Sequence, residues 1–250
     1  MGSQTLRRIR CLGAIPILAL IILLAPGAPA QTAGLHRQTL SRDGEPDVHY
    51  AISIPRNYSS SKPVPLILAL HFGVAGGSPA GAGFDLVRIL VGPALADLGG
   101  IIVAPDSVRG DWSSPENEKA VTALLDSVLS GYSIDRKKVA VTGYSMGGAG
   151  AWHFAEKFPE LFSAAIPVAG KPPASAEGWR LPVFAVHSRD DQVVPFGPTE
   201  ARIAELRAAG VNAKLVPLTG VTHFETYRFV DSLRQAVPWL REVWLRQISR

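Results

Sequence analysis

One segment is the strongest indication of the fold: Val139-Ala140-Val141-Thr142-Gly143-Tyr144-Ser145-Met146-Gly147-Gly148. In it, an apolar run leads directly into the predicted start of a helix. It carries the motif G-x-S-x-G, and glycine suits a strand-to-helix turn in which larger side chains beside the serine would collide. Such a turn exposes the Ser145 hydroxyl near the free N–H groups and positive dipole end of a helix. We therefore predict that Ser145 is a nucleophile; a glycine-rich packing turn is the alternative interpretation.

Apolar runs alternate with segments of helical periodicity on both sides of this motif. Seven runs rich in Val, Ile, Leu and Ala predict strands covered on both faces, at residues 49–54, 66–71, 101–104, 139–142, 164–169, 183–187 and 213–217. Helices are predicted at residues 84–98, 115–129, 146–158, 199–209 and 225–247. This alternation predicts a single α/β domain over residues 31–250, with a mostly parallel sheet, helices on both faces and no large lid.

Local signals refine the ends of these elements. Ser114 before Pro115 predicts an N-cap, and Gly210 predicts the end of a helix. Pro238 is expected to interrupt or kink the last helix. Residues 31–47 are polar, and we expect a loose lead-in there.

The first thirty residues have the three parts of a secretory signal peptide. Arg7, Arg8 and Arg10 precede an apolar run over residues 11–25, and small residues end the segment at Ala30. We predict a signal peptide over residues 1–30, cleaved after Ala30, and a secreted or periplasmic protein without stable membrane insertion after cleavage. An uncleaved anchor is the alternative.

Composition narrows the function classes. The chain of 250 residues is 47% hydrophobic and 18% charged, which suits a globular domain with a real core. The net charge is +4, but three arginines lie in the predicted signal peptide, so the high basicity does not indicate a nucleic-acid partner. Cys11 is the only cysteine, which excludes a thiol nucleophile and a cysteine metal site after cleavage. We expect no metal and no cofactor.

A serine nucleophile needs a base, and the chain has six histidines: His36, His49, His71, His153, His187 and His223. After a strand–turn–helix serine, the acid and then the histidine follow in chain order. His223 follows the last predicted strand and is the predicted base, whereas His187 ends an apolar strand. His153 lies two turns into the helix after Ser145 and is expected to point away.

The acid is expected between Ser145 and His223. Asp190 and Asp191 are adjacent, so only one can face the imidazole. Asp191, before the apolar turn Val193-Val194-Pro195, is the predicted orienter, and Asp190 the alternative.

An oxyanion needs two N–H donors. We predict the N–H of Met146, after the nucleophile, and that of Gly73 in the glycine-rich loop after an early strand, with Phe72 as the alternative second donor. This loop lacks the lysine of a phosphate-binding loop.

With these residues the chain resembles the α/β-hydrolase superfamily from about Tyr50 to Trp244. It is most similar to the phospholipase/carboxylesterase and dienelactone-hydrolase-like group, which includes secreted feruloyl-esterase-like and polyhydroxybutyrate-depolymerase-like enzymes. The resemblance rests on three segments: the nucleophile region around Ser145, residues 187–195, and Gly220-Val221-Thr222-His223. Residues 187–195 match the family's H-G-x-x-D-x-x-V-P segment, and this match supports Asp191 as the acid. Phe72 stands where the family often has glycine, which predicts a narrower acyl pocket.

The resulting prediction is a serine carboxylic ester hydrolase that acts on a small-molecule ester through an acyl-enzyme on Ser145. Phe72, Trp112 and Tyr144 are the predicted substrate contacts; the sequence predicts neither acyl specificity nor oligomeric state. A serine peptidase or another acyl-transfer enzyme of this fold is the alternative, and a non-catalytic binding protein a third possibility.

Overall fold

The computed structural model describes residues 1–2, 32–74, 76 and 78–248. The predicted signal peptide and its cleavage site therefore lie outside the described residues. Within the described part of the chain, the helices are too short or too polar to cross a bilayer.

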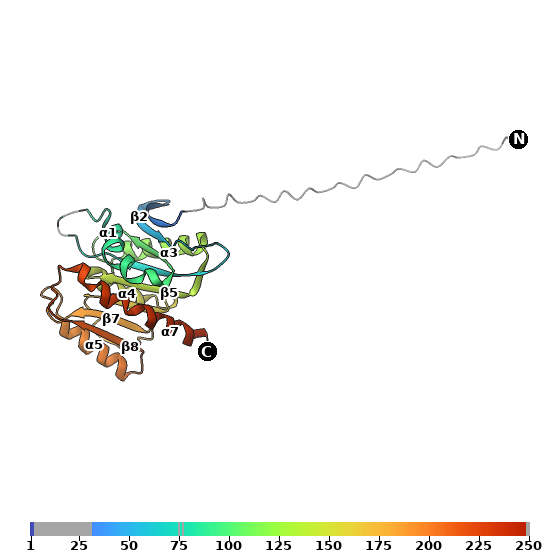
Figure 1. The fold of residues 1–250 in the computed structure, drawn as a ribbon. Helices are drawn as coiled ribbons and strands as arrows, with labels where there is room; N and C mark the ends of the chain where they lie inside the picture. The colour runs from blue at the N-terminus through green and yellow to red at the C-terminus, as the bar shows by residue number, and fades with distance from the viewer. Residues whose placement is uncertain (3–31, 75, 77, 249–250) are drawn as a thin grey trace. The chain divides into compact units, whose positions relative to one another are not determined.

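An eight-stranded sheet forms the centre of the domain (Figure 1). Its strands are β1 (Gly34–Arg42), β2 (Glu45–Ile54), β3 (Val64–Leu70), β4 (Ile101–Pro105), β5 (Ile134–Tyr144), β6 (Ala164–Val168), β7 (Val183–Ser188) and β8 (Ala213–Leu218). Their order is β1-β2-β4-β3-β5-β6-β7-β8. β2 pairs antiparallel with both β1 and β4, and all the other neighbouring strands pair parallel. The predicted, mostly parallel sheet is confirmed.

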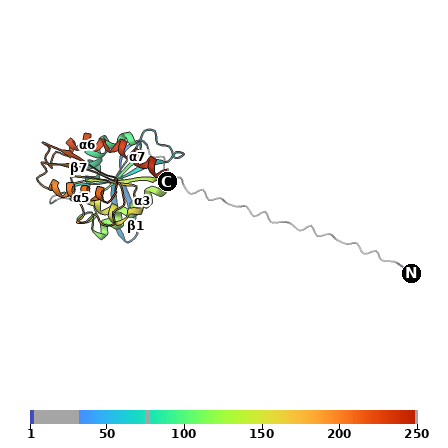
Figure 2. The same ribbon diagram turned by 90° about the horizontal axis from the view of Figure 1, so that it is seen from below.

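The helices cover both faces of this sheet, as Figure 2 shows. One face carries α3 (Pro115–Gly131), α4 (Met146–Lys157) and α5 (Phe196–Ala208). The other face carries α1 (Ala82–Leu86), which continues through a π turn into α2 (Gly92–Leu95) and a 3₁₀ turn (Ala96–Leu98), together with α6 (Val230–Arg234) and α7 (Ala236–Ile248). Further 3₁₀ turns span Pro159–Leu161 and Thr226–Phe229.

The central strands are apolar throughout because each of their faces meets a helix layer. In β3, Leu66, Leu68 and Leu70 pack toward α3 and α4, and Ile67 and Ala69 pack toward α1 and α7. Burial on both faces removes the polar alternation that marks a half-exposed strand.

The expected loose lead-in is wrong for residues 34–42, which form β1. This strand pairs antiparallel with β2, from Gly34 opposite Ile54 to Arg42 opposite Glu45. It is polar because it lies at the sheet edge, where its residues are half-buried or exposed. The dipeptide Asp43-Gly44, with Gly44 at φ 72°, is a hairpin signal that marks this turn in the sequence.

The predicted break at Pro238 is also wrong in position. The last helical segment is interrupted at Gln235, between α6 and α7, and Pro238 lies in the first turn of α7. Proline is tolerated there because the first turn needs no N–H donor within the helix.

The predicted ends of two other helices are confirmed. The Asn117 N–H donates to Ser114 Oγ at 3.3 Å, which caps α3. Gly210, at φ 79°, follows the end of α5.

Candidate active site

Ser145 lies in a strained turn between β5 and α4. Its φ is 57° and its ψ −115°, a backbone conformation that is rare for a residue with a side chain. Glycine is required on both sides: a Cβ on Gly143 would lie 2.1 Å from the Gly147 oxygen, and one on Gly147 would lie 1.8 Å from the Leu70 oxygen. The predicted strand-to-helix turn is confirmed, and it leaves Ser145 half-buried at the N-terminus of α4.

His223 and Asp191 converge on this serine from the loops after β8 and β7. Ser145 Oγ lies 2.8 Å from His223 Nε2, and His223 Nδ1 lies 2.7 Å from Asp191 Oδ2. The Asp191 side chain is fully buried. An acid, an imidazole and a hydroxyl in this chain of hydrogen bonds can move the serine proton to the imidazole and stabilise the imidazolium that forms.

The two adjacent aspartates have different partners. Asp191 Oδ1 accepts the N–H groups of Val193 and Val194 at 2.9 and 2.8 Å, which aims Oδ2 at His223. Asp190 Oδ2 instead accepts the Gly220 N–H at 2.6 Å and so ties the loop after β7 to the loop after β8. Asp191 is therefore the carboxylate that contacts the imidazole, and Asp190 joins the two loops.

Tyr144 holds His223 through its backbone. The Tyr144 hydroxyl donates to the His223 carbonyl at 2.5 Å, and the two rings lie 5.5 Å apart. Burial raises the pKa of the Tyr144 hydroxyl far above its usual range, so the group stays a neutral donor. Tyr144, a predicted substrate contact, therefore also fixes the position of His223, the predicted base.

The loop that carries Gly73 is fastened by His71, which is fully buried. The His71 Nδ1–H donates to the Phe72 carbonyl at 2.6 Å, and Nε2 accepts the Ser107 N–H at 2.9 Å. Burial lowers the pKa of His71, which keeps the ring neutral and able to make both contacts. Gly73 comes close to the nucleophile turn: a Cβ at Gly73 would lie 3.8 Å from the Met146 side chain. The two predicted oxyanion donors therefore lie on facing segments.

The prediction that Trp112 contacts substrate is corrected by its burial. Its side chain is 1% exposed, and its indole N–H donates to the His71 carbonyl at 2.9 Å. The side chain packs beside Gly150 of α4, where a Cβ would lie 2.6 Å from the Trp112 Cβ and 2.8 Å from its Cγ. Trp112 supports the loop that carries Gly73 from beneath and belongs to the core.

A cavity of about 560 Å³ opens over Ser145 and His223. It is lined by Phe72, Gly73, Val74, Tyr144, Ser145, Met146, Val193, His223, Phe224 and Thr226. Phe72 and Tyr144 line this cavity, and their contact with substrate stays a prediction. Val193 and Phe224, which are 50% and 76% exposed, were not predicted, although Phe224 directly follows the predicted base. Gln192 was not predicted either, and its Oε1 accepts the His223 N–H at 3.3 Å.

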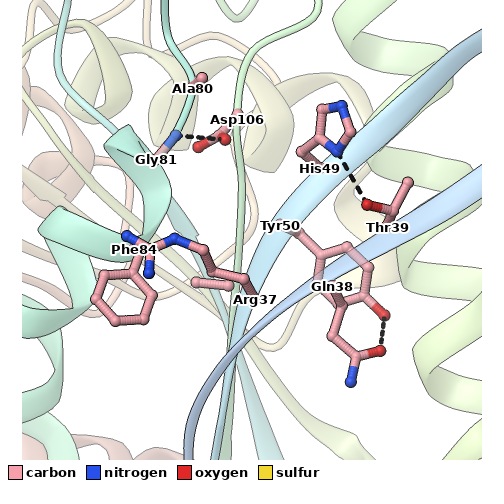
Figure 3. Close-up of a pocket in the computed structure, with 10 residues that line it drawn as sticks. Arg37, Gln38, Thr39, His49, Tyr50, Ala80, Gly81, Phe84 and Asp106 are labelled. Atoms are coloured by element: carbon pink, nitrogen blue, oxygen red, sulfur yellow. Dashed lines mark hydrogen bonds between the residues drawn. The ribbon is translucent and has the colours of Figure 1, made fainter.

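A second cavity, of about 620 Å³, lies between the β1–β2 hairpin and α1 (Figure 3). The Arg37 guanidinium lies over the Phe84 ring at 3.7 Å, and the Asp106 carboxylate accepts the N–H groups of Gly81 and Gly83 at 2.7 and 2.9 Å. None of the described residues that line this cavity is a serine or a cysteine. Within the described part of the chain, no group of three or more His, Cys, Asp or Glu side chains is arranged to hold a metal ion.

The sequence matches a known protein family and is similar to curated esterases. Residues 93–233 match the model of the dienelactone hydrolase family. A probable feruloyl esterase C of Aspergillus terreus is 26% identical over 69% of this chain and 66% of its own length. Feruloyl esterase C of Emericella nidulans is 24% identical over 72% of this chain and 70% of its own length. The chain thus spans about two thirds of the length of these curated relatives.

Solved structures agree on the fold. The crystal structure of a thermostable esterase superposes with a TM-score of 0.65 at 22% identity, covering 83% of this chain and 62% of that one. A ferulic acid esterase of the anaerobic fungus Anaeromyces mucronatus superposes with a TM-score of 0.58 at 17% identity. The match covers 84% of this chain and 93% of that one. The fold is the α/β-hydrolase fold, as the sequence predicts. Because the family model covers more than half of the chain, this protein belongs to the dienelactone hydrolase family.

Proposed function

We propose that the protein is a serine carboxylic ester hydrolase, with Ser145 as nucleophile, His223 as base and Asp191 as orienter. One observation carries the proposal: Ser145, His223 and Asp191 form a continuous chain of hydrogen bonds of 2.8 and 2.7 Å that opens into a cavity. The esterase names of the relatives support the same reaction class.

The proposed reaction has two acyl-transfer steps. His223 Nε2 takes the Ser145 proton as Oγ attacks the ester carbonyl, and the N–H groups of Met146 and Gly73 stabilise the negative oxygen of the tetrahedral intermediate. The intermediate collapses, and His223 gives the proton to the departing alcohol. His223 then takes a proton from water as the water oxygen attacks the acyl-enzyme. It returns this proton to Ser145 Oγ as the bond to the acyl group breaks and the carboxylic acid leaves.

The environment of Asp191 suits this role. Its carboxylate is buried and accepts two backbone N–H groups on Oδ1, which leaves Oδ2 in place beside the imidazole of His223. The strained turn at Ser145 and the neutral His71 each fix one side of the proposed oxyanion site, so little reorganisation is expected during reaction. We further propose a small-molecule ester as substrate and, from the N-terminal sequence pattern, a secreted or periplasmic location.

Hydrolysis of p-nitrophenyl acetate and butyrate by the purified chain tests the proposal. We expect Ser145→Ala to lower kcat by at least about 10⁴-fold, because the nucleophile is lost. Ser61→Ala, an exposed serine in the loop before β3, is the matched control and is expected to keep full activity. A fluorophosphonate probe is expected to label the wild type and not the Ser145→Ala variant. Full ester hydrolysis by Ser145→Ala would refute the assignment.

A further inference from the structure

A second buried histidine, His187, lies on the far side of Asp191 from His223. His187 Nε2 lies 3.3 Å from Asp191 Oδ2, the same oxygen that contacts His223 Nδ1 at 2.7 Å. The His187 side chain is 1% exposed, and the proposed reaction gives it no step. We propose that His187 is a positioning residue that holds Asp191 and its loop in the geometry needed by His223, an inference that rests on the proposed function.

The contacts of His187 fix its tautomer. Nε2 faces two acceptors, the Val194 carbonyl at 3.0 Å and Asp191 Oδ2, so this nitrogen must carry the hydrogen. Nδ1 lies 2.9 Å from Thr199 Oγ1 and, in this neutral tautomer, accepts the hydroxyl hydrogen. Thr199 is 2% exposed on α5, so the hydroxyl is itself held in place. In this tautomer the His187 Nε2–H therefore points toward the loop that carries Asp191.

One peptide segment links His187 to Asp191. The Val194 carbonyl accepts from His187, and the Val194 N–H donates to Asp191 Oδ1 at 2.8 Å. His187 thus positions Val194, and the Val194 N–H in turn positions the Asp191 carboxylate. The shorter Nε2 contact is with Val194, so we assign the main hydrogen bond to that carbonyl and treat Asp191 Oδ2 as the weaker, shared acceptor.

The charge balance requires a neutral His187. Asp191 and His223 are the titratable groups that face it, and Thr199 covers Nδ1. The Phe196 ring lies edge-on to His187 at 5.8 Å, and the Arg189 guanidinium lies over that ring, 4.5 Å from its centroid. Burial lowers the pKa of His187 despite the nearby carboxylate, so its ring does not compete as a cation for Asp191. The negative charge of Asp191 remains available to the imidazolium of His223.

Two pairs of substitutions separate positioning from simple packing. His187→Leu removes both ring contacts, whereas His187→Gln keeps an N–H donor. Thr199→Val removes the hydroxyl that fixes the tautomer, and Thr199→Ser restores it. His153→Leu, on the surface of α4 and bonded to Glu118, is the control for the loss of a histidine. Each variant is titrated with a fluorophosphonate, and kcat and KM are then measured separately with p-nitrophenyl butyrate.

We expect His187→Leu to lower kcat per active site by about 10- to 100-fold while KM stays within about threefold, because a displaced carboxylate misaligns His223 without altering the cavity. His187→Gln and Thr199→Ser are expected to recover most of the loss seen in His187→Leu and Thr199→Val. The far-downfield proton resonance of the His223 Nδ1–H, which reports its bond to Asp191, is expected to broaden or vanish in His187→Leu and to persist in His153→Leu.

The proposal is overturned if His187→Leu or Thr199→Val keeps kcat and this resonance and loses only thermal stability. If His187→Leu does not fold, His187→Gln and the Thr199 pair decide by the same two readouts. The resonance needs no substrate, so it tests positioning even if the wild type hydrolyses no ester, an outcome that would instead refute the proposed function.

Discussion

Asp106 and Asp191 are two carboxylates held by similar local contacts, yet only one of them contacts an imidazole. Each follows a parallel strand and accepts two backbone N–H groups at 2.7–2.9 Å. Asp106 uses both of its oxygens for these amides, whereas Asp191 uses Oδ1 for both and leaves Oδ2 for His223.

This difference separates a structural carboxylate from a proposed catalytic one. Asp106 fastens the start of α1 beside the larger cavity of Figure 3, and Asp191 lies fully buried behind the smaller cavity that contains Ser145. Cavity size therefore does not identify the proposed reactive site in this molecule. What identifies it is an imidazole brought to the free oxygen by a distant part of the chain.

The largest expected effect contrasts the two carboxylates directly. Asp191→Asn is expected to lower kcat by about 10³- to 10⁴-fold, because an amide neither fixes the tautomer of His223 nor stabilises its positive charge. Asp106→Asn is expected to cost about 1 kcal/mol of unfolding free energy through a weakened, half-buried pair of hydrogen bonds, while kcat per folded molecule stays within about threefold. Urea titrations and ester kinetics on both variants measure this contrast.

Asp190→Asn is the matched control, since Asp190 joins two loops without touching the imidazole. Equal, small losses in Asp190→Asn and Asp191→Asn would contradict the assignment of Asp191. A loss of kcat in Asp106→Asn as large as that in Asp191→Asn would remove the distinction between the two carboxylates.

A smaller effect concerns the buried histidine near each carboxylate, His71 near Asp106 and His187 near Asp191. Burial lowers the pKa of both rings, so each is neutral in the folded state at a pH where the unfolded chain already binds a proton. The unfolding free energy is therefore expected to fall as the pH drops below about 6.5, by up to about 1.4 kcal/mol per pH unit for each histidine.

Urea denaturation at pH 7 and pH 5 measures this slope. His71→Asn and His187→Gln should each flatten it, even if they lower the stability at pH 7, because one proton-binding site of the unfolded chain is gone. A slope unchanged in both variants would show that other groups cause the acid sensitivity.

The smallest expected effect contrasts the phenylalanine walls of the two cavities. Phe72→Gly enlarges the cavity over Ser145, and we expect kcat/KM for p-nitrophenyl octanoate relative to acetate to rise by about tenfold, since hydrophobic pockets discriminate chain length by only about 1–3 kcal/mol. Phe84→Ala in the larger cavity should leave this ratio unchanged. If Phe84→Ala shifted the ratio and Phe72→Gly did not, the larger cavity would be the acyl pocket.

Much of the fold follows from local sequence patterns. The seven predicted strands and the cap at Ser114 depend on residues that are close in the chain, and apolar runs covered on both faces are strong signals. β1 was missed because an edge strand is polar, so only the Asp43-Gly44 turn marks it. The break at Gln235 was misplaced because proline in a first helical turn gives the same sequence signal as proline in a kink.

The site also combines features that local sequence patterns predict with features that they do not. The nucleophile turn is predictable from local sequence, because the backbone comes too close to Gly143 and Gly147 for a side chain there. Chain order also limits the base and the acid to a few positions. Three features follow only from the folded chain: Asp191 faces His223, Trp112 is buried next to the loop of Gly73, and His187 shares the carboxylate. These contacts join segments about 30 to 80 residues apart or depend on which way a loop turns, and both are set by strand order and register across the sheet.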